Sequence, residues 1–206
     1  MSILSAPGDN ESMLVEIAKR ADGAGVLRCV RDNGSATWQK LPDRHAAFFA
    51  LHDLTHFAVE TELGCRRGFF GLVAEGWEIE DTTGKGSRGP LPEEAAHVEH
   101  IVGLFDSERA SGAIWTLEEF REFGGPGAHR LTIERIGAIR KRRGELFQQW
   151  AAVPIGETLR LQFPYNHPEG RTHALTEDCA RALAGGPPFA GSNRYGKRRM
   201  ALLRRR

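Results

Sequence analysis

The chain has 206 residues, of which 40% are hydrophobic and 27% are charged, with a formal net charge of +1 and a mean hydropathy of −0.40. These values are typical of a globular protein with one hydrophobic core. The absence of any apolar run near the ~20 residues of a membrane span argues against a membrane protein, and the first residues lack the apolar segment of a signal peptide. Three widely separated cysteines without a CxxC pair indicate neither a disulfide framework nor a cysteine zinc site, so we expect a cytoplasmic protein.

The first part of the chain is expected to form an antiparallel β-meander. Apolar runs rich in valine, leucine and isoleucine lie at residues 13–20 and 25–32, and a third run follows at residues 35–41. The intervening stretches "ADGAG" and "DNGS" contain the Asp-Gly and Asn-Gly pairs that supply positive φ in tight turns.

Two long helices are expected next. Pro42 and Asp43 open a helix of about twenty residues that ends at Gly64, a residue type suited to a helix C-terminus. The following stretch, residues 66–81, is short and apolar, and its pattern fits a helical turn or a strand. Pro92 and the two glutamates after it open a second helix, which continues to about residue 109.

Further helices and one strand complete the predicted fold. Thr116 and Glu119 form a capping box that opens a short helix. The glycine-rich residues 124–130 are expected to form a flexible connector to a long helix at residues 132–152, and residues 157–164 could add a strand. We therefore predict an α+β fold in which an N-terminal antiparallel β-meander packs on a mostly helical body.

The sequence predicts one globular domain at residues 1–164 and a loosely structured extension at residues 165–206. The extension ends in a basic tail, because residues 192–206 contain seven arginines and lysines and no acid. The other 21 cations face 27 acids, so residues 1–191 carry a net charge of −6. The predicted domain is therefore acidic and its tail is basic.

The motif "HDLTH" lies in the first predicted helix and places His52 and His56 four residues apart. At this spacing two imidazoles lie on one side of a helix and can bind the same metal ion. The alternative is that both histidines are packed in a core. An imidazole buried without a partner costs about 1–3 kcal/mol, which favours a site that satisfies both rings.

Further metal ligands have to come from other segments. Glu75 lies in an apolar stretch, and His97 and His100 lie in the second predicted helix. These three residues are the candidates for additional ligands, and Asp53 and Glu94 are the candidates for proton transfer. For Glu75 the competing interpretation is an ion pair with a nearby arginine. For His97 and His100 it is a solvated helix face.

The "HDLTH" helix resembles the zincin pattern His-Glu-x-x-His, which supplies two zinc ligands and a general base. In one branch of that family a downstream glutamate is the third ligand, and Glu75 stands nineteen residues after His56, a similar spacing. Asp53 occupies the position of the general base. The helix is also similar to the His-Asp-x-x-His helix of a ubiquinone-biosynthesis family, in which a later glutamate is a ligand; Gly68 occupies that position here.

These patterns lead to two functional hypotheses. In the first, the protein binds a divalent metal, zinc before iron or manganese, and if catalytic it hydrolyses a small ester, amide or phosphoester. In the second, it is a non-enzymatic binding or scaffold module with structural histidines, and its basic tail recruits an acidic partner or nucleic acid. Basic residues of the long helix could add to such a surface; they are Arg135, Arg140, Lys141, Arg142 and Arg143.

Overall fold

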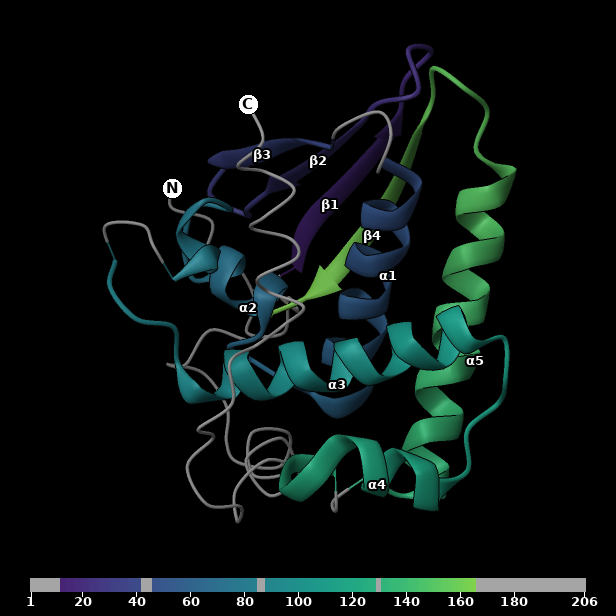
Figure 1. Ribbon diagram of the computed structural model, residues 1–206. Coiled ribbons are helices and arrows are strands. Elements are labelled where there is room, and N and C mark those ends of the chain that lie inside the picture. The colour runs from purple at the N-terminus through teal and green to yellow at the C-terminus, as the bar shows by residue number, and fades with distance from the viewer. Residues whose placement is uncertain (1–11, 42–45, 85–87, 129–130, 166–206) are drawn as a thin grey trace, which may run out of the picture.

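The computed structural model describes residues 12–41, 46–84, 88–128 and 131–165. Its one sheet within these ranges has four antiparallel strands in the order β3-β2-β1-β4. The strands are β1 (Ser12–Lys19), β2 (Gly25–Val30), β3 (Ala36–Leu41) and β4 (Thr158–Pro164). The last strand pairs with the first, so segments from the two ends of the described chain lie side by side in the sheet (Figure 1).

Alternation of side chains decides which face of the sheet is covered. In β1, Met13, Val15 and Ile17 are buried, whereas the residues between them are partly exposed. A period of two places such residues on one face, and this face packs against the helices. The sheet therefore contributes one half of the hydrophobic core.

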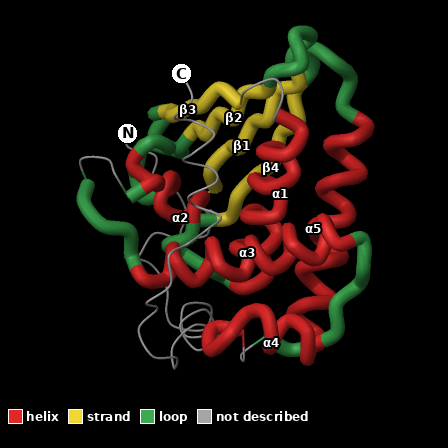
Figure 2. The backbone as a smooth tube through the Cα atoms, in the orientation of Figure 1, coloured by secondary structure: helices red, strands yellow, loops and turns green. Residues whose placement is uncertain are grey.

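The helical body consists of α1 (Ala46–Leu63), α2 (Phe69–Ala74), α3 (Glu93–Ser111), α4 (Leu117–Ala128) and α5 (Ile133–Ala152), with a 3₁₀-helix at Asp81–Thr83. Helix α1 lies against the sheet, α3 and α5 pack on α1, and α4 packs on α3 (Figures 1 and 2). All nine residues from position 52 to position 60 of α1 are buried. A helix buried on all sides is a core helix, so any polar side chain on this part of α1 needs a partner inside the protein.

The predicted α+β fold is confirmed for the sheet and the helices. The strand at residues 157–164 is present as β4, and the ambiguous segment 66–81 contains helix α2. The predicted connector at residues 124–130 differs, because α4 continues to Ala128. Close packing on α3 accounts for this: Gly124 is buried, its carbonyl accepts a 2.7 Å hydrogen bond from His100 Nε2, and a Cβ at Gly124 would lie 2.8 Å from Leu104 Cδ1.

Except for Tyr165, the predicted extension at residues 165–206, with its basic tail, lies outside the described residues. So does the start of the first predicted helix, at residues 42–45. Among the residues that the structure describes, no helix is both long enough and apolar enough to cross a membrane.

Candidate metal centre

Helix α1 places the two histidines of "HDLTH" next to each other inside the protein. His52 and His56 are both buried, their ring centroids are 4.8 Å apart, and the ring planes are nearly perpendicular at 81°. This arrangement follows from the four-residue spacing on the helix. Because the two rings are near neighbours, their nitrogen atoms can reach a common point.

Each imidazole is held at Nδ1 by a buried carboxylate. His52 Nδ1 donates to Asp106 Oδ2 of α3 at 2.7 Å, and His56 Nδ1 donates to Glu60 Oε1 at 3.2 Å. Metal-binding histidines in proteins are oriented in this way, with one ring nitrogen bonded to a carboxylate and the other on the metal. In both rings Nε2 is therefore the nitrogen left for a ligand.

Glu99 of α3 brings a carboxylate oxygen to the same place. Its Oε1 lies 3.3 Å from His56 Nε2. His52, His56 and Glu99 can each offer one ligand atom, and the three atoms lie within 4.8 Å of one another. Metal–nitrogen and metal–oxygen bonds of about 2.0–2.2 Å allow donors on opposite sides of one ion to be about 4 Å apart. The spacing therefore fits one ion after small side-chain movements.

Glu60 is fixed on its other side by helix α2. It is fully buried, and its carboxylate accepts hydrogen bonds from the backbone N–H groups of Phe70 at 3.2 Å and Gly71 at 3.1 Å. Gly68 leaves room for this carboxylate, since a Cβ at position 68 would lie 2.4 Å from Glu60 Cδ. The side chain that orients His56 is thus itself held by the start of α2.

The carboxylates determine the charge of the site. Burial alone would lower the pKa of His56, but the negative charges of Glu99 and Glu60 outweigh it and raise this pKa to about 10. Burial raises the pKa of Glu60 against the opposing effect of His56. Burial also acts to raise the pKa of Asp106, yet the hydrogen bond from His52 and the charge of Arg109 hold it below its usual value. Without a metal ion, the neighbouring carboxylates therefore favour the protonated form of His56.

The side chains present fit a divalent cation. His56 Nε2 is fully buried and makes no hydrogen bond to the described residues, although Glu99 lies at ion-pair distance. Two imidazoles and one carboxylate form the donor set of catalytic zinc sites with an open fourth position, and also of non-haem iron sites. Binding of a metal at His56 Nε2 would displace the proton from this nitrogen.

The other predicted site residues lie outside this group of three. Asp53 is fully buried on α1. Glu94 Oε1 accepts from the backbone N–H groups of Arg66 and Arg67 at 2.7 and 3.1 Å, which ties α3 to the loop before α2. Glu75 pairs with Arg67 Nε at 3.2 Å, in line with the ion-pair interpretation.

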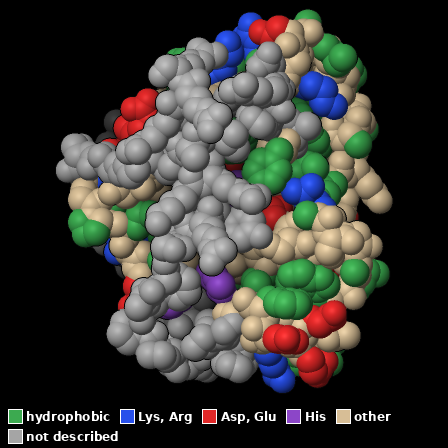
Figure 3. Space-filling view, viewed as in Figure 1, with side chains coloured by type: hydrophobic (Ala, Val, Ile, Leu, Met, Phe, Trp, Pro, Cys, Tyr) green, Lys and Arg blue, Asp and Glu red, His purple; other side chains and the backbone are tan. Residues whose placement is uncertain are grey.

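The two histidines of α3 also have contacts of their own. His97 Nε2 lies 4.0 Å from Glu93 Oε1, and His100 Nε2 donates to Gly124 O. Both side chains are partly exposed, and Figure 3 shows histidine side chains at the surface of the face that it presents. Among the described residues, therefore, neither His97 nor His100 belongs to the group formed by His52, His56 and Glu99.

The sequence-based prediction did not include Glu99, Asp106 or Glu60. Each of them has a signal in the sequence: Asp106 interrupts the apolar stretch "IVGLFDSE", and Glu99 precedes it by seven residues, which places both on one side of a helix. Glu60 follows His56 by four residues, the spacing at which two side chains of a helix meet.

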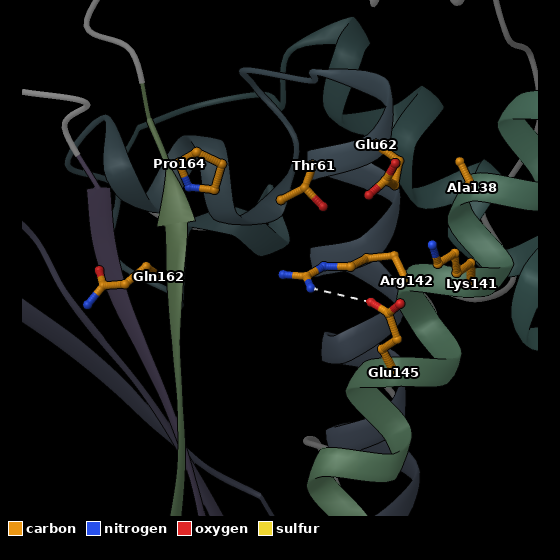
Figure 4. A pocket seen from close by; sticks show the side chains of 8 residues that line it. All are labelled: Thr61, Glu62, Ala138, Lys141, Arg142, Glu145, Gln162 and Pro164. Atoms are coloured by element: carbon orange, nitrogen blue, oxygen red, sulfur yellow. Dashed lines mark ion pairs between the residues drawn. The ribbon is translucent and has the colours of Figure 1, made fainter. Parts of the chain in front are cut away.

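A separate pocket of about 570 Å³ lies between α1, α5 and β4 (Figure 4). Its lining residues are Thr61, Glu62, Ala138, Lys141, Arg142, Glu145, Gln162 and Pro164. The Arg142 side chain extends into the space between α5 and β4, and its Nη1 lies 3.7 Å from Glu145 Oε2. None of His52, His56 and Glu99 lines this pocket, so it is not part of the metal centre.

Comparison of the chain with protein-family models finds no match. Comparisons with curated proteins and with solved structures likewise find none. Functional inference for this chain therefore depends on the geometry and chemistry of its own residues.

Proposed function

We propose that the protein binds a divalent metal ion through His52, His56 and Glu99. The observation that carries this proposal is the pair of buried carboxylates, Asp106 and Glu60, that hold the two imidazoles at Nδ1. A packed histidine needs one partner, whereas here both rings are oriented so that Nε2 remains for a ligand near a third donor.

Zinc is the expected ion, with iron or manganese as alternatives. Two imidazoles and one carboxylate occur at catalytic zinc sites, and the same donors bind iron in oxygenases. Three further acids in or next to the core, Asp53, Glu60 and Asp106, would in their ionised form add to the attraction for a dication.

Three protein ligands leave room for a water molecule and a substrate, so we propose that the protein is a metal-dependent hydrolase of a small molecule. A bound ion would act as a Lewis acid and lower the pKa of a bound water. Asp106 and Glu60 would keep the two ligand rings in place. Asp53, buried next to His52 on α1, is the proposed proton acceptor, and Glu94 is less suited because two backbone N–H groups already occupy one of its oxygens.

The test is a zinc-binding measurement on the full chain, purified without a histidine tag, by plasma mass spectrometry and by calorimetric titration. The informative variants are His52→Ala with His56→Ala, and Glu99→Gln, which keeps the side-chain size. Glu93→Gln is the matched control, because Glu93 lies on the same helix and is exposed. We expect about one zinc ion per wild-type and control chain, and a loss of at least about tenfold in affinity for the Glu99 variant.

Wild-type protein that takes up neither zinc, iron nor manganese would overturn this proposal. So would a Glu99→Gln variant that binds zinc as tightly as wild type. Retained secondary structure in the variants, measured by circular dichroism, would separate a lost ligand from a lost fold.

The alternative is a non-enzymatic module with structural histidines. The pKa of His56, raised to about 10 by Glu99 and Glu60, favours it, because the imidazolium and two carboxylates form a closed ionic cluster without metal. A basic surface for nucleic acid or an acidic partner has less support in the described chain, since Arg140 and Arg143 of α5 pair with the buried Glu108. The basic tail itself lies outside the described residues.

A further inference from the structure

Helices α1 and α3 form a seam of polar contacts that is buried in the middle and most exposed at one end. The side chains of His56, His52 and Arg109 are 0%, 7% and 28% exposed, in this order along the seam. Phe48, one helical turn before His52 on α1, is 40% exposed. At the other end of the seam the side chain of Glu99 is 16% exposed, so the end formed by Phe48 and Arg109 is the more exposed of the two.

Phe48 connects the metal centre with Arg109. Its ring stacks on His52, with centroids 6.0 Å apart and planes 12° from parallel, and Arg109 Cζ lies 5.9 Å from the centroid of the same ring. A molecule that comes from this end toward His52 thus meets an aromatic ring and a guanidinium group first.

The guanidinium of Arg109 has hydrogen-bonding capacity left. Its Nη2 lies 3.4 Å from Asp106 Oδ1, a long contact to a carboxylate that also accepts from His52 at 2.7 Å. The Nε of Arg109 is buried and makes no hydrogen bond to any described residue. A buried donor without a partner costs about 1–3 kcal/mol, and an arginine has five N–H donors in a planar fork that matches two oxygens.

We propose that Arg109 binds the oxyanion group, a phosphate or a carboxylate, of a small-molecule ligand of this site. The ligand's body lies against Phe48 and reaches toward His52. This proposal rests on the proposed metal site and assigns the class of its substrate, an anionic small molecule. Arg109 is a binding residue here, and Asp106 is shared between it and His52.

The positive charge of the Arg109 guanidinium favours an oxyanion over a neutral or cationic ligand group. The Nε donor of Arg109, which has no partner among the described residues, requires an acceptor, and a charged acceptor forms shorter and stronger bonds with guanidinium than a neutral one. The carboxylates of the centre itself, Glu60, Glu99 and Asp106, are engaged with histidines. An added oxyanion would thus supply the partner that Arg109 Nε lacks among the described residues.

The test is calorimetric titration of inorganic phosphate and of acetate into the zinc-loaded full chain and, separately, into the metal-free chain. The variant is Arg109→Gln, and the matched control is Arg121→Gln, which removes an exposed cation from α4. We expect at least one of the two anions to bind wild type and the control, and to bind Arg109→Gln about tenfold more weakly or worse, with equal zinc content in all three proteins. The tighter of the two anions identifies the oxyanion type.

The outcomes separate this inference from the metal proposal. Anion binding that persists in Arg109→Gln, or no anion binding to wild type, would overturn the role of Arg109 while the zinc titration stands. Loss of zinc in Arg109→Gln would also overturn it, because Arg109 would then only support Asp106. If wild type binds no metal but the metal-free chain binds an anion in an Arg109-dependent manner, the metal site fails and the oxyanion site stands alone.

Discussion

At the scale of single residues, the carboxylates that hold the histidines distinguish this site from ordinary core packing. A buried histidine could use a backbone carbonyl or a hydroxyl as its partner. Here Asp106 and Glu60, both nearly or fully buried, take that place. Burying two carboxylates for this purpose is unfavourable unless a cation balances them, and in the protein His56 and Arg109 supply the cations.

Replacing Asp106 tests the support that His52 receives. In Asp106→Asn the amide cannot accept from His52 with the strength of a carboxylate, so we expect the zinc affinity to fall by about 10–100-fold. Calorimetry in competition with a chelator measures this change. Asp32→Asn, in an exposed turn between β2 and β3 that contributes no residue to the site, is the control. An unchanged affinity in Asp106→Asn would mean that the hydrogen bond serves the fold and not the metal.

The position of the two histidines follows from the sequence at this scale, whereas the choice of the third donor also depends on how the helices pack. The spacing of His52 and His56 depends only on helix geometry. Which side of α3 meets α1 depends on how the two helices pack. The structure presents Glu99 and Asp106 to α1 and leaves His97 and His100 to other partners, although all four residues lie on one helix.

At the scale of the elements, two helices show opposite requirements for glycine. Gly71 of α2 packs against backbone, because a Cβ there would lie 1.8 Å from Arg66 O. Gly137 of α5 is exposed, and a Cβ there would meet nothing within 4 Å. Close packing thus requires a glycine in α2. In α5 the glycine only lowers the stability of the helix.

This contrast gives a paired prediction. Gly71→Ala should lower the free energy of unfolding by at least about 2 kcal/mol, because the backbone of Arg66 cannot easily move away. Gly137→Ala should raise it by about 0.5–1 kcal/mol, because alanine favours the helix. Urea unfolding followed by circular dichroism measures both changes. Equal effects of the two substitutions would contradict the packing described for α2.

In the sheet, Glu16 connects three strands on the face that does not contact α1. It lies in β1 opposite Arg28 of β2 and Arg160 of β4, and its carboxylate pairs with them at 2.6 and 3.1 Å. The hydrogen bond from Arg28, more than the one from Arg160, holds the pKa of Glu16 below its usual 4.5 despite partial burial. This carboxylate therefore adds stability only while it is ionised.

The pH dependence of this contribution has a definite sign. Because the pKa of Glu16 is lower in the folded protein, its stabilisation is present above about pH 4.5 and is lost as the pH falls through the folded-state value. Glu16→Gln should be less stable than wild type by about 0.5–1 kcal/mol at pH 7. The difference should shrink in urea unfolding series toward pH 3. A difference independent of pH would show that side-chain packing, and not charge, is responsible.

The elements themselves were largely predictable, and the exceptions have physical reasons. The turn sequences "ADGAG" and "DNGS" and the alternating apolar residues are sufficient to predict strands β1 to β3. Helix α4 continues through Gly124 because this glycine fits closely against Leu104 of α3 and its carbonyl accepts from His100. Such a contact depends on the tertiary structure, whereas the sequence of residues 124–130 on its own favours a loop.

At the scale of the whole molecule, the proposed metal site joins α1 to α3 inside the protein and should stabilise the entire fold. A ligand that binds only the folded state stabilises it by about 2.7 kcal/mol when present at a hundred times its dissociation constant. For a chain of this size we expect the midpoint of thermal unfolding to rise by about 5–10 °C with zinc. Differential scanning calorimetry measures the shift. Glu99→Gln should show little or none, and an equal shift in that variant would place the zinc elsewhere.

The pairing of β4 with β1 has a consequence for the time course of folding. Ser12 Oγ donates to Gln162 Oε1 across a separation of 150 residues, and the strands around this contact complete the sheet. Contacts this distant in sequence form slowly, because a long loop must close first. During synthesis, β1 has an unpaired edge until β4 leaves the ribosome. The nascent chain is therefore most exposed to strand-mediated aggregation during this interval, and a chaperone that covers the edge of β1 would act at that stage.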